Sequence, residues 1–333
     1  MISEKVPNPM PAPGPLKVYI TVDVEYAGMA HIGGAKAAQI PDASMECVVD
    51  GKSMGLSYVV ALLARHGLKG TFFVEPMARY HFGEKALART VEILLAAGQD
   101  VQLHLHPAWL TFKDGKPHSD RLLDYSPAEQ QDLIGAGRAA LESMGARIVA
   151  FRAGGFAADD RQYDALRGLG IPLSSSYCLG YRDQGCAIAG YGDRNDAFTA
   201  AGIREIPASS YRIRDPRKLL GYACKPFQVG STSSANVRRV VEAARRAGMD
   251  SLSLLLHNFE FADRKEDDWS WKPIRANAAV ARHFEATCAY LADPRGRWRV
   301  STFAAAAQEP AVATASERTP PVVPSLNRIY LPI

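Results

Sequence analysis

The sequence alternates between segments typical of β-strands and segments with the apolar spacing of α-helices, and this alternation most limits the folds open to the chain. The first strand pattern, LKVYITVDVE at 16–25, is followed by helical spacing at 53–67 and by a second strand pattern, KGTFFVEP at 69–76. Strands that alternate with helices indicate a parallel sheet. Further strand patterns stand at 99–107, 147–155, 172–177, 250–261 and 297–303, and further helical patterns at 86–98, 126–145, 159–170, 234–248 and 277–292.

Four regions can be distinguished from this pattern. About seven strand and helix units in roughly 290 residues are enough to close a barrel of parallel strands, so we predict one α/β barrel domain over residues 16–307. Residues 1–15 form a proline-rich leader, and the glycine-rich, polar residues 178–235 predict a loop-rich insertion within the barrel. The proline content of residues 308–333 predicts an arm on the surface or on a neighbouring subunit, which leaves an oligomer open.

Composition and charge argue against several classes of function. The formal net charge is only +4, from 39 basic and 35 acidic residues without a basic block, so nucleic acid is not an expected partner. The five cysteines are odd in number and show no C-x-x-C spacing, so neither a disulfide framework nor a zinc knuckle is indicated. No segment resembles a signal peptide or reaches the roughly eighteen apolar residues of a membrane span, so we expect a cytoplasmic protein.

Two histidines stand at the end of the strand pattern at 99–107, on either side of a leucine. Successive side chains of a strand point to opposite faces, so His104 and His106 point the same way. Two imidazoles placed in this way can coordinate one divalent metal. Half-buried histidines that bond to the backbone are the alternative, and the pair alone leaves both interpretations open.

Most polar residues that could carry chemistry occupy similar positions in the pattern. Each lies at or just beyond the C-terminal end of a predicted strand, and in a barrel of parallel strands those ends meet at one mouth. Random placement would scatter these residues over strands, helices and loops, so their convergence favours the metal interpretation of the two histidines. The residues are Asp23, Glu25, Glu75, His104, His106, Arg152, His257 and Glu260.

Five short motifs carry a resemblance to a known family. They are YITVDVE, KGTFFVEP, GQDVQLHLHP, FRAGGF and LSLLLHNFEF, and over roughly residues 17–305 their order and spacing resemble those of the polysaccharide deacetylase family. That family is also called the NodB-homology domain or carbohydrate esterase family 4. The resemblance implies a distorted (β/α)7 barrel that hydrolyses N-acetyl or O-acetyl groups of sugars with one divalent metal, commonly zinc.

The family's first motif pairs a general-base aspartate with a metal-binding aspartate. The resemblance places Asp23 at the base position, but the adjacent metal position is Val24, which cannot bind a metal. Glu25, on the same strand face as Asp23, is then the expected carboxylate ligand, as in relatives with a D-x-D or D-x-E motif. The opposite assignment, with Asp23 on the metal, stays open.

The family's second motif spaces its two metal histidines four residues apart. Ala108 stands four residues after His104, so the resemblance leaves His106 as the second imidazole ligand. A carboxylate with two imidazoles suits zinc, and also cobalt, nickel, manganese or iron.

The remaining motifs supply further roles. Arg152 matches a family arginine that orients the catalytic carboxylate, and His257 matches the general-acid histidine. A surface salt bridge and a core histidine are the respective alternatives. Other polar and aromatic residues could contact substrate or His257, although solvation or core packing explains them as well. They are Glu75, Glu260, Trp269 and Trp271.

The expected function is that of a metal-dependent N-deacetylase of an amino sugar in the biosynthesis of cell-surface polysaccharide, such as the O-antigen of lipopolysaccharide. Its substrate would be a small saccharide, a sugar nucleotide or a lipid-linked glycan. Two other functions stay open: a hydrolase of the same fold that acts on a cyclic ureide or imide, and a catalytically silent carbohydrate-binding or scaffold protein. The altered Val24 and Ala108 positions favour the silent protein, whereas the joint presence of Asp23, Arg152 and His257 opposes it.

Overall fold

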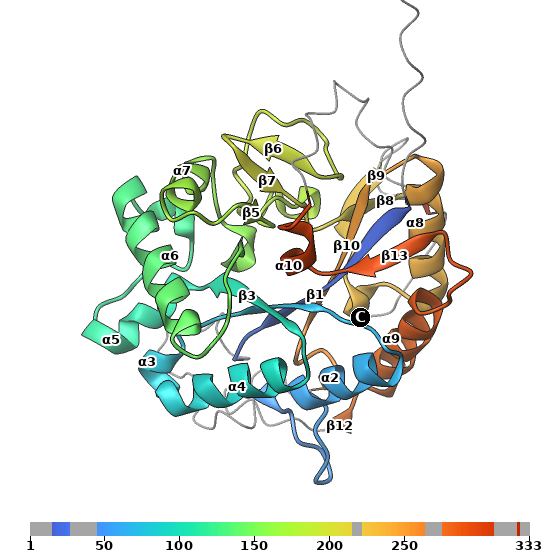
Figure 1. Cartoon of the computed structure of the whole chain (residues 1–333), viewed down its shortest axis with the longest axis horizontal. Helices are drawn as coiled ribbons and strands as arrows, with labels where there is room; N and C mark the ends of the chain where they lie inside the picture. Colours follow the sequence, from blue (N-terminus) through green and yellow to red (C-terminus); the bar gives the residue numbers. More distant parts are fainter. Residues whose placement is uncertain (1–14, 27–44, 215–221, 264–274, 310–324, 327–333) are drawn as a thin grey trace, which may run out of the picture.

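The computed structural model describes residues 15–26, 45–214, 222–263, 275–309 and 325–326. Its centre is a sheet of parallel strands in the order β10-β1-β2-β3-β4-β5-β7, with β6 antiparallel at one edge and β13 paired with the first half of β1 (Figure 1). The strands of this sheet are β1 (Leu16–Val24), β2 (Thr71–Val74), β3 (Asp100–Leu105), β4 (Ala150–Ala153), β5 (Leu173–Ser174), β6 (Phe198–Ala200), β7 (Ile203–Glu205), β10 (Ser251–His257) and β13 (Trp298–Ser301).

Helices surround this sheet, as Figure 1 shows for α2, α4, α6, α8 and α9. Ser126 begins α6 with a capping box, in which its hydroxyl and the Glu129 carboxylate each accept a backbone N–H bond from the other residue. The α-helices are α2 (Leu56–Arg65), α3 (Arg79–Phe82), α4 (Glu84–Ala96), α5 (Thr111–Asp114), α6 (Pro127–Glu142), α7 (Arg161–Gly168), α8 (Ser234–Arg246), α9 (Ala278–Leu291) and α10 (Phe303–Ala306). Short 3₁₀ turns are η2 (Pro107–Leu110), η3 (Leu122–Asp124), η4 (Gly154–Phe156), η5 (Leu179–Tyr181) and η6 (Val229–Ser231).

The sheet curls into a barrel with one irregular seam. No strand ladder joins β7 to β10 among the described residues; instead, the segment that follows β7 bonds to β10. The N–H of Ser209 donates to Ser253 O at 3.3 Å, and the N–H of Leu255 donates to Phe227 O at 2.9 Å. This arrangement confirms the distorted barrel predicted from the sequence.

The region 178–235 contributes more to the barrel than the loop-rich insertion that we predict from its composition. Its β7 pairs in parallel with β5, and the β8–β9 hairpin, β8 (Ser210–Arg214) and β9 (Tyr222–Pro226), stands beside the seam. In the C-terminal arm, β14 (Ser325–Leu326) pairs with β8 of the same chain. The two-residue strands β11 (Ala262–Asp263) and β12 (Arg275–Ala276) pair outside the main sheet.

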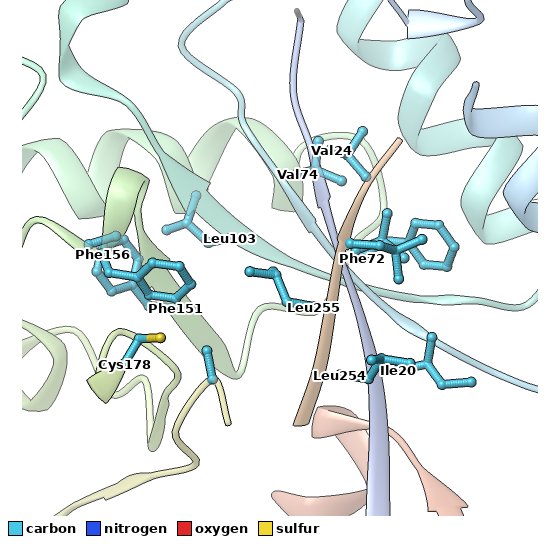
Figure 2. Packing of buried hydrophobic residues seen from close by; sticks show 14 of the residues in the cluster. Ile20, Val24, Phe72, Val74, Leu103, Phe151, Phe156, Cys178, Leu254 and Leu255 are labelled. Carbon is cyan, nitrogen blue, oxygen red and sulfur yellow. The ribbon is translucent and has the colours of Figure 1, made fainter. Parts of the chain in front are cut away.

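The strands divide their side chains between two environments. Alternate apolar residues such as Ile20, Val24, Phe72 and Leu103 belong to the large apolar core of the molecule (Figure 2). The intervening residues of each strand point into the barrel, where a small separate cluster gathers around Phe303. Its members are Tyr19, Phe73, Ala150, Leu173, Ile206, Phe303 and Ala306.

The two ends of the barrel differ in character. The N-terminal ends of the strands are closed by α10, because the Phe303 N–H donates to Thr71 Oγ1 at 3.0 Å and the Ala304 N–H donates to Asp100 Oδ2 at 2.9 Å. At the opposite end the inward positions are polar and begin with Asp23. Within the described residues, no helix is both long and apolar enough to cross a bilayer.

Candidate metal centre and catalytic site

Three side chains from the ends of β1 and β3, which lie on either side of β2 in the sheet, meet around one point at the polar end of the barrel. Glu25 follows β1, His104 lies within β3 and His106 directly follows it. The Oε1 atom of Glu25 lies 2.9 Å from His104 Nε2 and 3.2 Å from His106 Nε2. All three residues are at least nine-tenths buried.

In each imidazole, the hydrogen bond made by Nδ1, the outer nitrogen, determines whether Nε2, the inner nitrogen that faces Glu25, carries a hydrogen or a lone pair. His104 Nδ1 lies 2.9 Å from the backbone oxygen of Arg152, and His106 Nδ1 lies 2.8 Å from Asp120 Oδ2. Both partners are oxygens that accept, so each Nδ1 carries the hydrogen. In the neutral tautomer both Nε2 lone pairs therefore point at the same carboxylate oxygen, and this arrangement needs positive charge between them.

This donor set fits a divalent metal. A metal bound tetrahedrally with bonds of about 2.0–2.1 Å holds its ligand atoms roughly 3.3 Å apart. The observed separations are 2.9 and 3.2 Å, and the ligand atoms of Glu25, His104 and His106 all lie within 4.8 Å of one another. Histidines that donate Nδ1–H to an oxygen and present Nε2 inward are the usual arrangement around a metal.

The electrostatics of the cluster also favour a cation. Burial acts to raise the pKa of Glu25, but His106 and His104 hold it well below the usual range. Burial acts to lower the pKa of His106, but the carboxylates of Asp120 and Glu25 raise it well above the usual range. Both shifts show that the carboxylates around these imidazoles attract positive charge.

Asp23 lies beside this cluster and forms an ion pair with the guanidinium of Arg152. Its Oδ1 atom accepts a bond from Arg152 Nη1 at 2.5 Å, and both side chains are almost fully buried. Arg152 is held in turn by Thr21 Oγ1 at 3.1 Å and Ser175 Oγ at 2.9 Å. Because the guanidinium already balances the charge of Asp23, the geometry favours Glu25 as the carboxylate that faces a metal.

His257, at the end of β10, also lies close to Glu25. Its Nδ1 lies 2.9 Å from Glu260 Oε1, which also accepts a bond from Gln228 Nε2 at 2.6 Å, and its Nε2 lies 3.9 Å from Glu25 Oε1. Burial acts against the imidazolium, but the bond to Glu260 and the charge of Glu25 raise the pKa of His257 to about 9. Asp23, Glu25 and His257 offer a second group of ligand atoms within 4.8 Å of one another.

Among the predicted substrate contacts, Glu75 is buried just after β2. Glu75 is 1% exposed, and its two oxygens accept the backbone N–H bonds of Met77 and Ala78 at 2.7 Å each. Burial raises its pKa to about 8. Glu75 therefore holds the turn after β2, which is a different role from the substrate contact that the sequence suggests.

The remaining expected contacts have different outcomes. Glu260 is the hydrogen-bond partner of His257, one of the two roles that we expect for it from its position. Trp269 and Trp271 lie outside the described residues.

Two further residues that the sequence did not predict hold the metal ligands themselves in place. Asn258 accepts the backbone N–H bond of Glu25 through Oδ1 at 3.0 Å, and Asp120 orients His106. Asn258 could have been found, because it follows His257 directly. Asp120 lies 14 residues beyond His106 on an irregular segment, where no periodicity indicates its direction.

Comparison with known proteins finds similarity in structure but not in sequence. No family model matches the chain, and no curated protein is significantly similar to it in sequence. A candidate polysaccharide deacetylase from Mycobacterium smegmatis has a similar structure, with TM-score 0.55, 16% identity and coverage of 96% of this chain and 100% of that one. The chain therefore has the NodB-like fold of that structure, in agreement with the fold implied by its motifs.

Two further structures are similar at lower TM-scores. A 4-alpha-glucanotransferase from Thermococcus litoralis has TM-score 0.48 and 7% identity, and the match covers 94% of this chain and 42% of that one. A family 4 carbohydrate esterase from Bacillus subtilis has TM-score 0.37 and 11% identity, over 86% of this chain and 79% of that one.

Proposed function

We propose that this protein is a metal-dependent N-deacetylase that removes the acetyl group from an N-acetylated amino sugar. The observation that carries the proposal is the convergence of Glu25 Oε1 with Nε2 of His104 and His106 at 2.9 and 3.2 Å. Asp23 and His257 are register partners on the adjacent strands β1 and β10 beside this cluster, and each is held by a partner of opposite charge, Arg152 and Glu260. The NodB-like fold and the five motifs support the choice of a sugar deacetylase.

Glu25, His104 and His106 would hold the metal, and Asp23 would act as the base. When bound, a divalent metal supplies positive charge for the carbonyl oxygen and makes water acidic enough to attack at neutral pH. Asp23 accepts the proton of the attacking water through the carboxylate oxygen that Arg152 leaves open. Arg152 keeps this carboxylate in place because the guanidinium is itself fixed by Ser175.

His257 completes the reaction as the acid. Its Nδ1–H is bonded to Glu260, so a proton on Nε2 faces the cluster and can pass to the departing nitrogen. An amide nitrogen leaves poorly as an anion, so this proton is required. The bond to Glu260 and the charge of Glu25 raise the pKa of His257 to about 9 in the metal-free protein, which favours the charged, proton-donating form at neutral pH.

We infer that the substrate is a saccharide that has not yet been exported. It would be a sugar nucleotide or a lipid-linked glycan used in the assembly of polysaccharide or lipopolysaccharide. Glu25 and His106 supply a carboxylate and an imidazole that Val24 and Ala108 lack, and this supports the chemistry despite the altered motif positions.

The proposal is tested by acetate release from N-acetylhexosamine oligosaccharides and from nucleotide-linked N-acetylhexosamine. The zinc-loaded protein should release acetate, and a chelator should stop it. Asp23→Asn and His257→Ala should lower kcat by roughly 10²- to 10⁴-fold while zinc stays bound. His118→Ala is the matched control, because that partly exposed histidine pairs with Asp114 and has no part in the cluster.

Two results would contradict the proposal. A zinc-loaded protein that releases no acetate from any amino sugar, but opens a cyclic imide, would favour the non-sugar hydrolase. A protein that binds saccharide with zinc present and releases nothing would favour the silent carbohydrate-binding protein.

A further inference from the structure

We infer that Asp120 is a positioning residue for the metal centre, which fixes the His106 imidazole from the surface of the molecule. This inference rests on the proposed function, since it assigns Asp120 to the same centre. The Asp120 carboxylate spans two neighbours, because Oδ2 lies 2.8 Å from His106 Nδ1 and Oδ1 accepts the Ala108 N–H bond at 3.3 Å. It therefore holds both the imidazole and the turn that follows β3.

The segment that carries Asp120 is itself held in place. Two residues later the 3₁₀ turn η3 begins at Leu122, whose side chain is 1% exposed. The N–H of Leu123 donates to Ala157 O at 3.2 Å, and Arg161 donates to Leu123 O at 2.5 Å. Asp120 thus reaches His106 from an anchored part of the chain, which is what a positioning role requires.

The two imidazoles of the centre are supported in different ways. His104 donates to the backbone oxygen of Arg152, a neutral group that a side-chain substitution does not remove. His106 donates to a carboxylate, and a carboxylate partner both orients an imidazole and makes its inner nitrogen a stronger donor toward a metal. Asp120 is therefore a side chain through which the affinity of the centre can be changed without substituting a ligand.

A second pair in the same region serves as an internal comparison. Asp114 and His118 are also an aspartate and a histidine in contact, with 2.9 Å between Oδ2 and Nε2. The aspartate side chains are almost equally exposed, 41% for Asp114 and 40% for Asp120. The difference is that His106 belongs to the metal cluster and His118 does not.

The test measures zinc affinity of the full chain by competition with a chromophoric chelator at one fixed pH. Asp120→Ala should weaken zinc binding by roughly 10- to 100-fold. Asp120→Asn keeps an oxygen that can accept the His106 bond but loses the charge, so its affinity should fall less than that of Asp120→Ala. Asp114→Ala should bind zinc as the unchanged protein does. Thermal unfolding of the metal-free variants checks that each one folds.

The outcomes separate this inference from the proposed function. If the unchanged protein binds zinc and His104→Ala does not, the centre is established whatever Asp120 does. Equal zinc affinity for Asp120→Ala and Asp114→Ala would then overturn the positioning role alone. If the unchanged protein binds no zinc, the metal centre and this inference fall together.

Discussion

At Gly154 the absence of a side chain makes room for the His106 imidazole. A Cβ atom at this position would lie 2.5 Å from His106 Nδ1, a separation too short for non-bonded atoms. We predict that Gly154→Ala displaces the imidazole, breaks its bond to Asp120 and weakens zinc binding by at least tenfold, as loss of an outer partner does. The measurement is the zinc dissociation constant of the folded variant.

Gly135 offers the control for this substitution. It lies within α6, where a Cβ would meet only the Leu169 side chain at an ordinary 3.4 Å, so Gly135→Ala should leave zinc affinity unchanged. Unchanged affinity in Gly154→Ala would show that the His106 position is not needed for binding.

Single residues were predictable where strand periodicity governs them. The inward direction of Asp23, His104 and Arg152 follows from alternation along strands, and the structure places all three at the polar end of the barrel. Glu75 obeys the same alternation, yet its oxygens are used by its own turn. Periodicity gives the direction of a side chain and not its partner.

Among the elements, β7 carries a buried carboxylate that makes stability depend on pH. Glu205 is fully buried and accepts bonds from the Tyr163 hydroxyl at 3.1 Å and the Tyr177 N–H at 2.9 Å. Burial outweighs these bonds and raises its pKa from 4.5 to about 7. The folded protein therefore binds this proton more tightly than the unfolded chain.

The sign of the pH effect follows directly. Below about pH 4.5 Glu205 is protonated in both the folded and the unfolded state, so its stabilising protonation is fully present. As the pH rises towards 7, Glu205 ionises first in the unfolded chain, and the free energy of unfolding falls. We predict that Glu205→Gln removes this loss, worth roughly 3 kcal/mol in the free energy of unfolding. Urea unfolding of both proteins at several pH values is the check. A difference between them that does not change with pH would contradict it.

Element positions were predictable to the extent that each element is long enough to show a period. The spans of α4, α6, α8 and α9 agree with the spacing of their apolar residues. β7 has only three residues, too few for alternation to show, so its place in the sheet depends on pairing with β5.

For the whole molecule, metal removal should lower stability. A ligand that binds only the folded state stabilises it by about 2.7 kcal/mol at a free concentration one hundred times its dissociation constant. We predict that zinc raises the unfolding temperature of the unchanged protein and of His118→Ala, and that a chelator reverses the rise. His104→Ala should show no rise, and an equal shift in that variant would place the zinc elsewhere.

The sequence by itself determined the class of fold, the order of most elements and the end of the barrel that holds the polar residues. These properties depend on local periods and on the rule that parallel strands end at one face, both of which are written along the chain. The tertiary structure alone favoured one of the two carboxylates that the sequence left open, because Arg152 balances Asp23 while Glu25 faces the two imidazoles. It also brought Asp120 to His106. Such pairings depend on distances between segments far apart in the chain, and residue spacing along one segment carries no information about them.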